Sequence, residues 1–284
     1  MMDLPIVDSH VHLWDPTHFS MPWLADIPLL NRPYGLRDYE QGTKDLPIAA
    51  LVSVEAAVEP AEALLEARWL DSLAQNEPRL QAIVAAAPLE QGPAVRAHLE
   101  SLVALSPRIK GVRRNLQDES LDFCLQPTFL HGVQMLAEYS LSFDLCITHQ
   151  QLPGVTELVR QCPDTAFVLD HIGKPDIKHS QLHPWRTYLK ELAALPNVQC
   201  KVSGMVTEAD HRFWKVADLA PFVQTVFENF GEDRVMFGGD WPVISLASAY
   251  HRWHEALGEL TSHLSLVAQR KFWGDNARRF YRMP

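Results

Sequence analysis

The amino-acid sequence predicts an α/β protein built as a single (β/α)8 barrel. Apolar runs rich in β-branched residues alternate with amphipathic stretches along most of the chain, as buried parallel strands and their covering helices do. Eight such runs occur in 284 residues, close to the roughly 250 residues that eight βα units usually take. The first run is followed by no glycine-rich phosphate loop, which an open doubly wound sheet would normally carry there. We therefore expect residues 1–284 to form one barrel domain.

The expected strands are short and aliphatic, and they end in polar residues or glycine. They cover residues 6–13, 49–56, 81–87, 109–115, 141–148, 166–170, 198–202 and 235–237. The expected helices between them carry apolar residues at intervals of three and four. They cover residues 60–75, 92–105, 128–138, 154–161, 185–195 and 218–230, with further helical segments at 264–270 and 272–281. Repeated strand–helix units of this kind form a parallel sheet with right-handed crossovers.

Residues 16–47, after the first strand, depart from this alternation. The segment holds five prolines and little helical periodicity. Irregular segments of this length inside a compact domain tend to be functional. We expect an irregular loop insertion that either covers a site or packs its aromatic residues onto the core.

The charge balance and the cysteines restrict the partners and the compartment. Lys and Arg number 25 against 35 Asp and Glu, for a net charge of −10, whereas nucleic-acid binding requires a basic surface. The four cysteines are scattered without a CxxC pair, which is typical of free thiols in a reducing compartment. No apolar stretch reaches the 18 residues or so of a membrane span. We expect a cytoplasmic monomer or homodimer that acts on a small molecule, with no nucleic-acid or membrane partner.

Histidines and aspartates stand where several predicted strands end. His10 and His12 lie two residues apart on the first strand, so their side chains point to the same face. His149 follows the fifth strand, His171 the sixth and Asp240 the eighth. Sites of this barrel form at the carboxyl ends of the strands, and imidazoles with one carboxylate are typical zinc ligands. Taken alone, the two histidines of the first strand would more often be surface residues of an edge strand.

Cationic and aromatic residues supply further candidates. Arg113 and Arg114 end the fourth strand; because adjacent strand residues face opposite ways, we expect only one of them to reach the site. A guanidinium there would hold a substrate through its fork of donors or pair with a carboxylate. Glu55 and Lys201 are weaker candidates, for a ligand contact or a salt bridge. Two tryptophans follow site residues directly and are expected to line the pocket: Trp14 and Trp241.

Five sequence blocks together resemble the amidohydrolase superfamily, and within it the branch of lactone hydrolases that act on sugar lactones and on 2-pyrone-4,6-dicarboxylate. The blocks are DSHVHLW at 8–14, KGVR at 110–113, DHIGKP at 170–175, KVSG at 201–204 and FGGDWP at 237–242. The DHIGKP and GGDWP blocks are specific, whereas the HxH pair alone is not. The resemblance runs in order over nearly the whole chain.

The resemblance implies a hydrolytic site at the mouth of the barrel. By motif match, His10 and His12 take the strand-one role, His171 the strand-six role and Asp240 that of general base, while His149 falls where many members have a metal ligand. The chain departs from two-metal members, because Arg113 and Arg114 stand where those carry a bridging carboxylated lysine. The resemblance is compatible with one divalent metal, zinc as first choice, or with a metal-free site.

The expected activity is hydrolysis of a sugar-acid lactone such as L-fucono- or L-rhamnono-lactone, with Asp240 taking a proton from water. Hydrolysis of a dicarboxylate lactone and metal-dependent decarboxylation are the alternatives within the superfamily. A non-catalytic carbohydrate-binding barrel would keep the aromatic pocket without needing Asp240.

Overall fold

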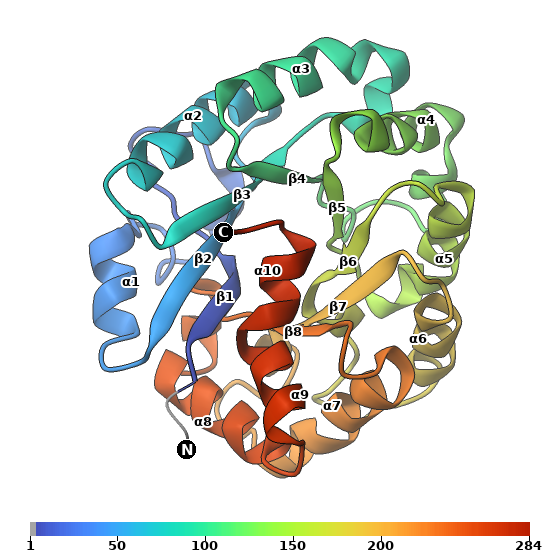
Figure 1. The fold of residues 1–284 in the computed structure, drawn as a ribbon. Helices are drawn as coiled ribbons and strands as arrows, with labels where there is room; N and C mark the ends of the chain where they lie inside the picture. The colour runs from blue at the N-terminus through green and yellow to red at the C-terminus, as the bar shows by residue number, and fades with distance from the viewer. Residues whose placement is uncertain (1–3) are drawn as a thin grey trace.

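The computed structural model describes residues 4–284 and confirms the (β/α)8 barrel (Figure 1). Each strand pairs in parallel with the next strand of the chain. A parallel bridge from Val11 to Trp241 brings the segment after the last strand back to the first and closes the ring. The strands are β1 (Ile6–Val11), β2 (Ile48–Val54), β3 (Leu80–Ala86), β4 (Ile109–Arg113), β5 (Ser142–Leu145), β6 (Phe167–Leu169), β7 (Val198–Val202) and β8 (Val235–Phe237).

The helices surround the strands and cover their outer faces (Figure 1). They are α1 (Leu36–Gly42), α2 (Ala63–Ala74), α3 (Arg96–Leu105), α4 (Pro127–Met135), α5 (Leu152–Gln161), α6 (Trp185–Ala193), α7 (Val216–Phe230), α8 (Tyr250–Thr261), α9 (Leu266–Arg270) and α10 (Asn276–Phe280). No helix in the part of the chain from residue 4 onward is long and apolar enough to cross a membrane. That residues 1–284 form one domain stays a prediction.

Two helices were not predicted. α1 is a short helix inside the proline-rich segment 16–47, where periodicity is hard to see over seven residues. α8 buries Tyr250, Trp253 and Leu257 on one face, so its spacing of three and four was present in the sequence. β5 ends at Leu145, earlier than residue 148, and the chain then turns away from the sheet.

The segment 16–47 packs its aromatic residues onto the core and also forms part of a cavity wall. Phe19, Tyr34 and Tyr39 are buried, and Tyr34 packs edge-to-face on Trp14. Trp23 lines the cavity described below. The aromatic residues of the segment therefore pack onto the core, as one of the two alternatives expected, and Trp23 also reaches the cavity.

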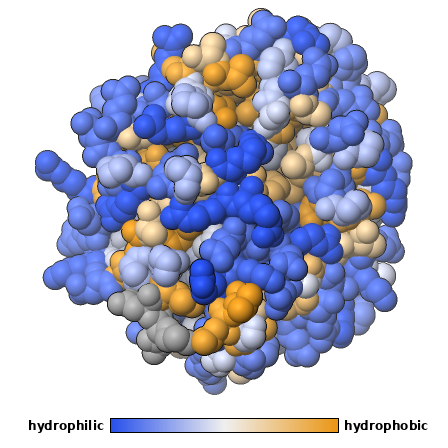
Figure 2. All heavy atoms as spheres, viewed as in Figure 1, coloured by the Kyte–Doolittle hydropathy of each residue, from blue (hydrophilic) through white to orange (hydrophobic). Residues whose placement is uncertain are grey.

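The end of the barrel where the strands begin is covered by α10 (Figure 1). Ala277, Phe280 and Tyr281 turn inward and pack against an apolar cluster inside the barrel. The outer surface on this side is mostly hydrophilic (Figure 2). This cover leaves the opposite end, where the strands finish, for the site.

Candidate active site

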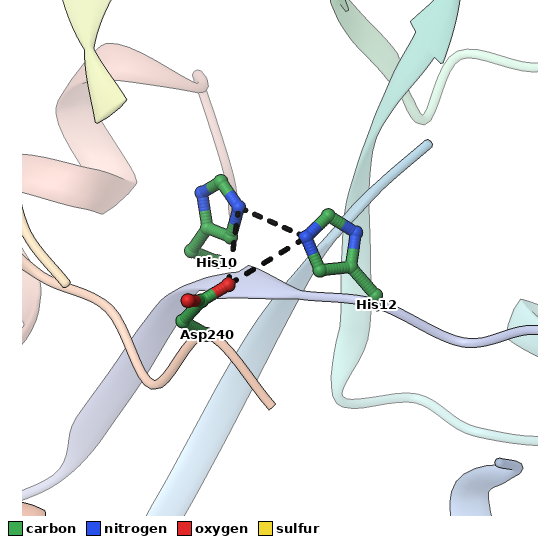
Figure 3. A group of neighbouring side chains, drawn as sticks. All are labelled: His10, His12 and Asp240. Carbon is green, nitrogen blue, oxygen red and sulfur yellow. Dashed lines mark hydrogen bonds and ion pairs between the residues drawn. The ribbon is translucent and has the colours of Figure 1, made fainter. Parts of the chain in front are cut away.

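Two histidines and one aspartate converge where β1 ends and the chain leaves β8 (Figure 3). Nε2 of His10 lies 3.1 Å from Nε2 of His12. Oδ1 of Asp240 lies 3.8 Å from the first nitrogen and 3.7 Å from the second. The Asp240 amide donates to the His10 carbonyl at 2.8 Å, and the His12 amide donates to the Trp241 carbonyl at 2.7 Å. The closure of the barrel therefore holds the cluster.

Asp8 ties the same two segments together from the outer side. Its Oδ1 accepts from the amides of Gly239 at 2.7 Å and His10 at 3.1 Å. Its Oδ2 accepts from the hydroxyls of Tyr39 at 3.0 Å and Tyr250 at 2.6 Å. Each carboxylate oxygen is thus satisfied twice, which is what a fully buried carboxylate requires.

His171 joins the cluster from the turn after β6. Its Nε2 lies 3.9 Å from Oδ1 of Asp240, and its Nδ1 lies 2.9 Å from the Ser203 hydroxyl. Both His171 and Asp240 adopt positive φ, 52° and 53°, a conformation that costs energy for residues other than glycine. Gly204 makes room for them, because a Cβ there would lie 2.5 Å from Nδ1 of His171.

The side chains of His10, His12 and Asp240 fit a single divalent metal ion. Tetrahedral zinc with bonds of about 2.0–2.1 Å places its ligand atoms roughly 3.3 Å apart, and the His10, His12 and Asp240 atoms are separated by 3.1–3.8 Å. Nδ1–H of His12 donates to the Val54 carbonyl at 2.9 Å, which leaves Nε2 free to bind a metal. Burial holds the pKa of His10, His12 and His171 well below 6.5, so the imidazoles are neutral.

Burial also changes the pKa of the carboxyl group in the cluster. The pKa of Asp240 is raised to about 7 by burial, against the opposing effect of the Lys174 and Arg113 cations. A carboxylate with a pKa near neutrality is suited to take up and return a proton.

A cavity of about 450 Å³ opens above the cluster. His12, His171 and Asp240 contribute to its lining, together with cationic, amide and indole side chains. Arg113, Lys174, Asn115, Gln117, Trp14 and Trp23 supply those groups. Trp14 donates its indole N–H to the Arg32 carbonyl and Trp23 donates to the Ala56 carbonyl. The tryptophans therefore offer the cavity an aromatic surface, not a donor.

The two neighbouring arginines face opposite ways. Arg113 lines the cavity and donates to Glu55, from Nε to Oε1 at 2.5 Å and from Nη2 to the backbone oxygen at 2.7 Å. Arg114 pairs instead with Glu90 at 3.2 Å and Glu119 at 2.6 Å. Because side chains alternate along the strand, Arg113 lines the cavity while Arg114 forms salt bridges outside it. Glu55 is the ion-pair partner of Arg113.

Several predicted residues lie away from the cavity. His149 sits in a turn beyond β5 with Nδ1 3.0 Å from the Lys174 carbonyl, and neither group of potential metal ligands within residues 4–284 includes it. Trp241 packs against Tyr34 and Tyr39. Lys201 is fully buried beneath His10 and does not line the cavity.

Three residues in or beside the site were not predicted from the sequence: Lys174, Gln117 and Asp170. Lys174 lies in the cavity with Nζ 2.5 Å from the Gln117 side-chain oxygen. Asp170 contacts His10 from below at 3.3 Å. Asp170 and Lys174 stand in the DHIGKP block beside His171, so the block itself was the available signal, whereas nothing in the sequence indicated Gln117.

The barrel and the cluster at the carboxyl ends of its strands define a (β/α)8-barrel protein with a candidate active site. The sequence profile of the amidohydrolase family matches residues 7–283, and the chain belongs to this family.

Named relatives extend over almost the full length. An L-fucono-1,5-lactonase of Burkholderia multivorans is 33% identical over 98% of this chain and 96% of its own length. Another from Burkholderia ambifaria is 30% identical, covering 98% of this chain and 95% of its own. A crystal structure of an amidohydrolase from Burkholderia multivorans with bound zinc superposes with a TM-score of 0.88 at 31% identity, covering 99% of this chain and 100% of that one.

Proposed function

We propose that this protein hydrolyses a sugar-acid lactone to the free acid. The observation that carries the proposal is the position of the Asp240 carboxylate, with its pKa near 7, among neutral imidazoles in the lining of a polar and aromatic cavity. The similarity to two L-fucono-1,5-lactonases over nearly the whole chain supports an aldonolactone as substrate.

The cavity residues are suited to hold a hydroxylated ring. Arg113 has two of its nitrogens held by Glu55, and its Nη1 makes only a 3.7 Å contact to Asp170 among the residues described. That nitrogen and Lys174 can donate to ring oxygens. The indole surfaces of Trp14 and Trp23 can pack on the apolar C–H faces of a sugar.

Asp240 acts as the general base in this proposal. The carboxylate takes a proton from water as the water oxygen bonds to the lactone carbonyl carbon. When the ring C–O bond breaks, the same proton returns to the departing ring oxygen. The product acid ionises at neutral pH, so each turnover releases one proton to solution.

The cluster would hold one divalent metal, zinc as first choice, through His10, His12 and Asp240, with His171 adjacent. Such an ion, when bound, polarises the carbonyl group and stabilises negative charge on its oxygen. His171 is held by Ser203 with its Nε2 toward Asp240, so it can hydrogen-bond to the reacting water or the developing oxyanion.

The cations of the cavity favour a lactone without extra carboxylates. A dicarboxylate substrate calls for several uncompensated cations, yet Arg114 and Lys201 lie outside the cavity and Arg113 is paired with Glu55. Among the described residues that line the cavity, Lys174 is the remaining cation, and its ammonium contacts the side-chain oxygen of Gln117 and not a carboxylate.

A proton-release assay on aldonolactones tests the proposal. The panel contains L-fucono-, L-rhamnono-, L- and D-galactono- and D-arabinono-lactone, with and without added zinc. We expect turnover well above spontaneous hydrolysis, falling about 10²–10⁴-fold in Asp240→Asn. Full turnover in a folded Asp240→Asn protein would contradict the base assignment. Failure on every lactone, or release of CO₂ from aromatic acids instead, would contradict the proposed reaction.

A further inference from the structure

Nδ1 of His10 points away from His12 and Asp240 (Figure 3), and two competing groups lie near it. Lys201 Nζ lies 3.2 Å from this nitrogen and Asp170 Oδ1 lies 3.3 Å from it. An ammonium can only donate a hydrogen bond, and a carboxylate can only accept one. The two neighbours therefore favour opposite tautomers of the same neutral imidazole.

Without a metal, the hydrogen bonds of the cluster determine the tautomer. The Val54 carbonyl only accepts, so His12 carries its proton on Nδ1 and Nε2 is an acceptor. In the absence of a metal, the 3.1 Å contact between the two Nε2 atoms is then a hydrogen bond only if the proton of His10 lies on Nε2. Nδ1 of His10 is left as an acceptor, and Lys201 donates to it.

With a metal, His10 must present the lone pair of Nε2 instead. Its proton then lies on Nδ1 and needs an acceptor, which Asp170 provides. Neither carboxylate oxygen of Asp170 has a hydrogen bond of good geometry in the described residues, although the carboxylate is fully buried. A proton on Nδ1 would supply the missing donor, while an N–H of Lys201 still aimed at Nδ1 would oppose it.

Lys201 is firmly held as a cation at this position. It contacts Asp144 Oδ2 at 2.5 Å and Asp170 Oδ1 at 3.0 Å, and all three side chains are fully buried. The hydroxyl of Tyr281 donates to the same oxygen of Asp144 at 2.8 Å. The ammonium therefore stays close to His10 in both states of the cluster.

We propose that Lys201 and Asp170 are positioning residues that set the tautomer of His10, and through it the affinity of the cluster for a divalent metal. Asp170 favours the metal-binding tautomer and Lys201 favours the metal-free one. The affinity part rests on the metal site of the proposed function, whereas the tautomer part concerns the metal-free protein alone.

Nitrogen NMR of metal-free protein labelled with ¹⁵N-histidine tests the tautomer, with the His10 signals assigned by their loss in His10→Asn. We expect the proton of His10 on Nε2 in the wild type and on Nδ1 after zinc is added. A proton on Nδ1 in the metal-free wild type would overturn the proposal. Because this measurement needs no substrate and no variant of Lys201, it is decided even if the lactonase assay fails.

Zinc affinity, measured by competition with a chromophoric chelator, tests the two neighbours separately. Asp170→Asn is expected to bind zinc about 10–100-fold more weakly. Lys201→Met, combined with Asp144→Asn so that one buried cation and one buried carboxylate are removed together, is expected to bind zinc roughly tenfold more tightly. Tyr281→Phe is the control, because it removes a hydrogen bond to Asp144 without changing the neighbours of His10, and its zinc affinity should stay within about twofold.

Affinities of folded Asp170→Asn and Lys201→Met/Asp144→Asn that both equal the wild-type value would overturn the proposal. If the double variant does not fold, Asp170→Asn and the NMR measurement still decide it. Zinc binding that is absent from the wild type but appears in the double variant would support the proposal while contradicting the metal site of the wild-type enzyme.

Discussion

Replacing Gly204 with alanine should reduce activity because the added Cβ would displace His171, in addition to straining the backbone. Gly204 has a φ of 58°, and an added Cβ would lie 2.5 Å from Nδ1 of His171 and 2.9 Å from Oδ2 of Asp240. An ordinary contact is at least 3.4 Å, so His171 must move by about 1 Å. A displacement of that size in a catalytic constellation costs about 100-fold in rate, or about 2.7 kcal/mol in transition-state stabilisation.

The matched control is Gly231→Ala. Gly231 has a φ of 69°, but no atom lies within 4 Å of its added Cβ. Both substitutions strain the backbone: Gly204, with a ψ of 6°, is left-handed helical and costs alanine about 1–2 kcal/mol, whereas Gly231, with a ψ of 173°, lies in a region almost exclusive to glycine and costs about 1–3 kcal/mol. Each kcal/mol lowers the melting temperature by roughly 2–4 °C.

The assay compares kcat/KM on the best lactone with thermal unfolding for both variants. We expect both proteins to lose stability and Gly204→Ala alone to lose about 100-fold in kcat/KM. A folded Gly204→Ala protein within about threefold of wild-type kcat/KM, or an equal activity loss in Gly231→Ala, would refute the reasoning.

Three further outcomes are expected. In zinc-free protein, any kcat/KM should rise with pH through about 7, because Asp240 must lose its proton to act as a base, and added zinc should move the rise to lower pH. Burial, and then the Glu55 carboxylate, raise the pKa of Glu66 from 4.5 to about 8. Between these two pKa values, the folded state therefore holds a proton that the unfolded state lacks. The free energy of unfolding, measured with urea, should fall as the pH rises from about 5 to 8, by up to about 1.4 kcal/mol per pH unit. The fall should be less steep in Glu66→Gln. Lys174→Met should raise KM about tenfold or more while zinc content is unchanged, because it removes a half-buried donor from the cavity.

Each of these outcomes has a control and a contrary result. A flat pH profile between about 6 and 8 in zinc-free protein would exclude Asp240 as the titrating base. Glu255→Gln, at an exposed position, should leave the pH dependence of stability intact; an equal effect there would contradict the assignment to Glu66. Lys178→Met removes an exposed lysine close in sequence to Lys174, and an equal rise in KM would show that loss of charge alone explains the effect.

The barrel could be predicted because its strands are buried on both faces. Such strands are continuous apolar runs, and the eight predicted runs coincide with β1–β8 to within a few residues. β5 is shorter than its predicted run. The apolar sequence continues past Leu145 through Cys146 and Ile147, but these two residues are buried in a loop and not in the sheet. Hydrophobicity reports burial, and it does not distinguish a strand end from a buried turn.

The convergence of His10, His12, His171 and Asp240 could be inferred from strand ends, whereas the partners of charged residues could not. Strand alternation indicated that only one arginine would face inward, but not that Glu55 would pair with it. Such partners lie 57 or 58 residues apart in sequence, as Asp144 and Lys201 do. Their pairing depends on which strands are neighbours across the barrel, and no local pattern records that.

The polar layer beneath the cluster links the stability of the core to the chemistry of the site. Asp144, Asp170 and Lys201 occupy inward positions of β5 and β7 and the end of β6, where a barrel usually packs apolar side chains. Removing one member of a buried ion pair costs about 3–5 kcal/mol, because its partner remains buried and unpaired. An apolar replacement of the whole layer could preserve the fold, yet it would remove both partners of Nδ1 of His10. The layer therefore fits the proposed role beside His10 better than a requirement of the barrel.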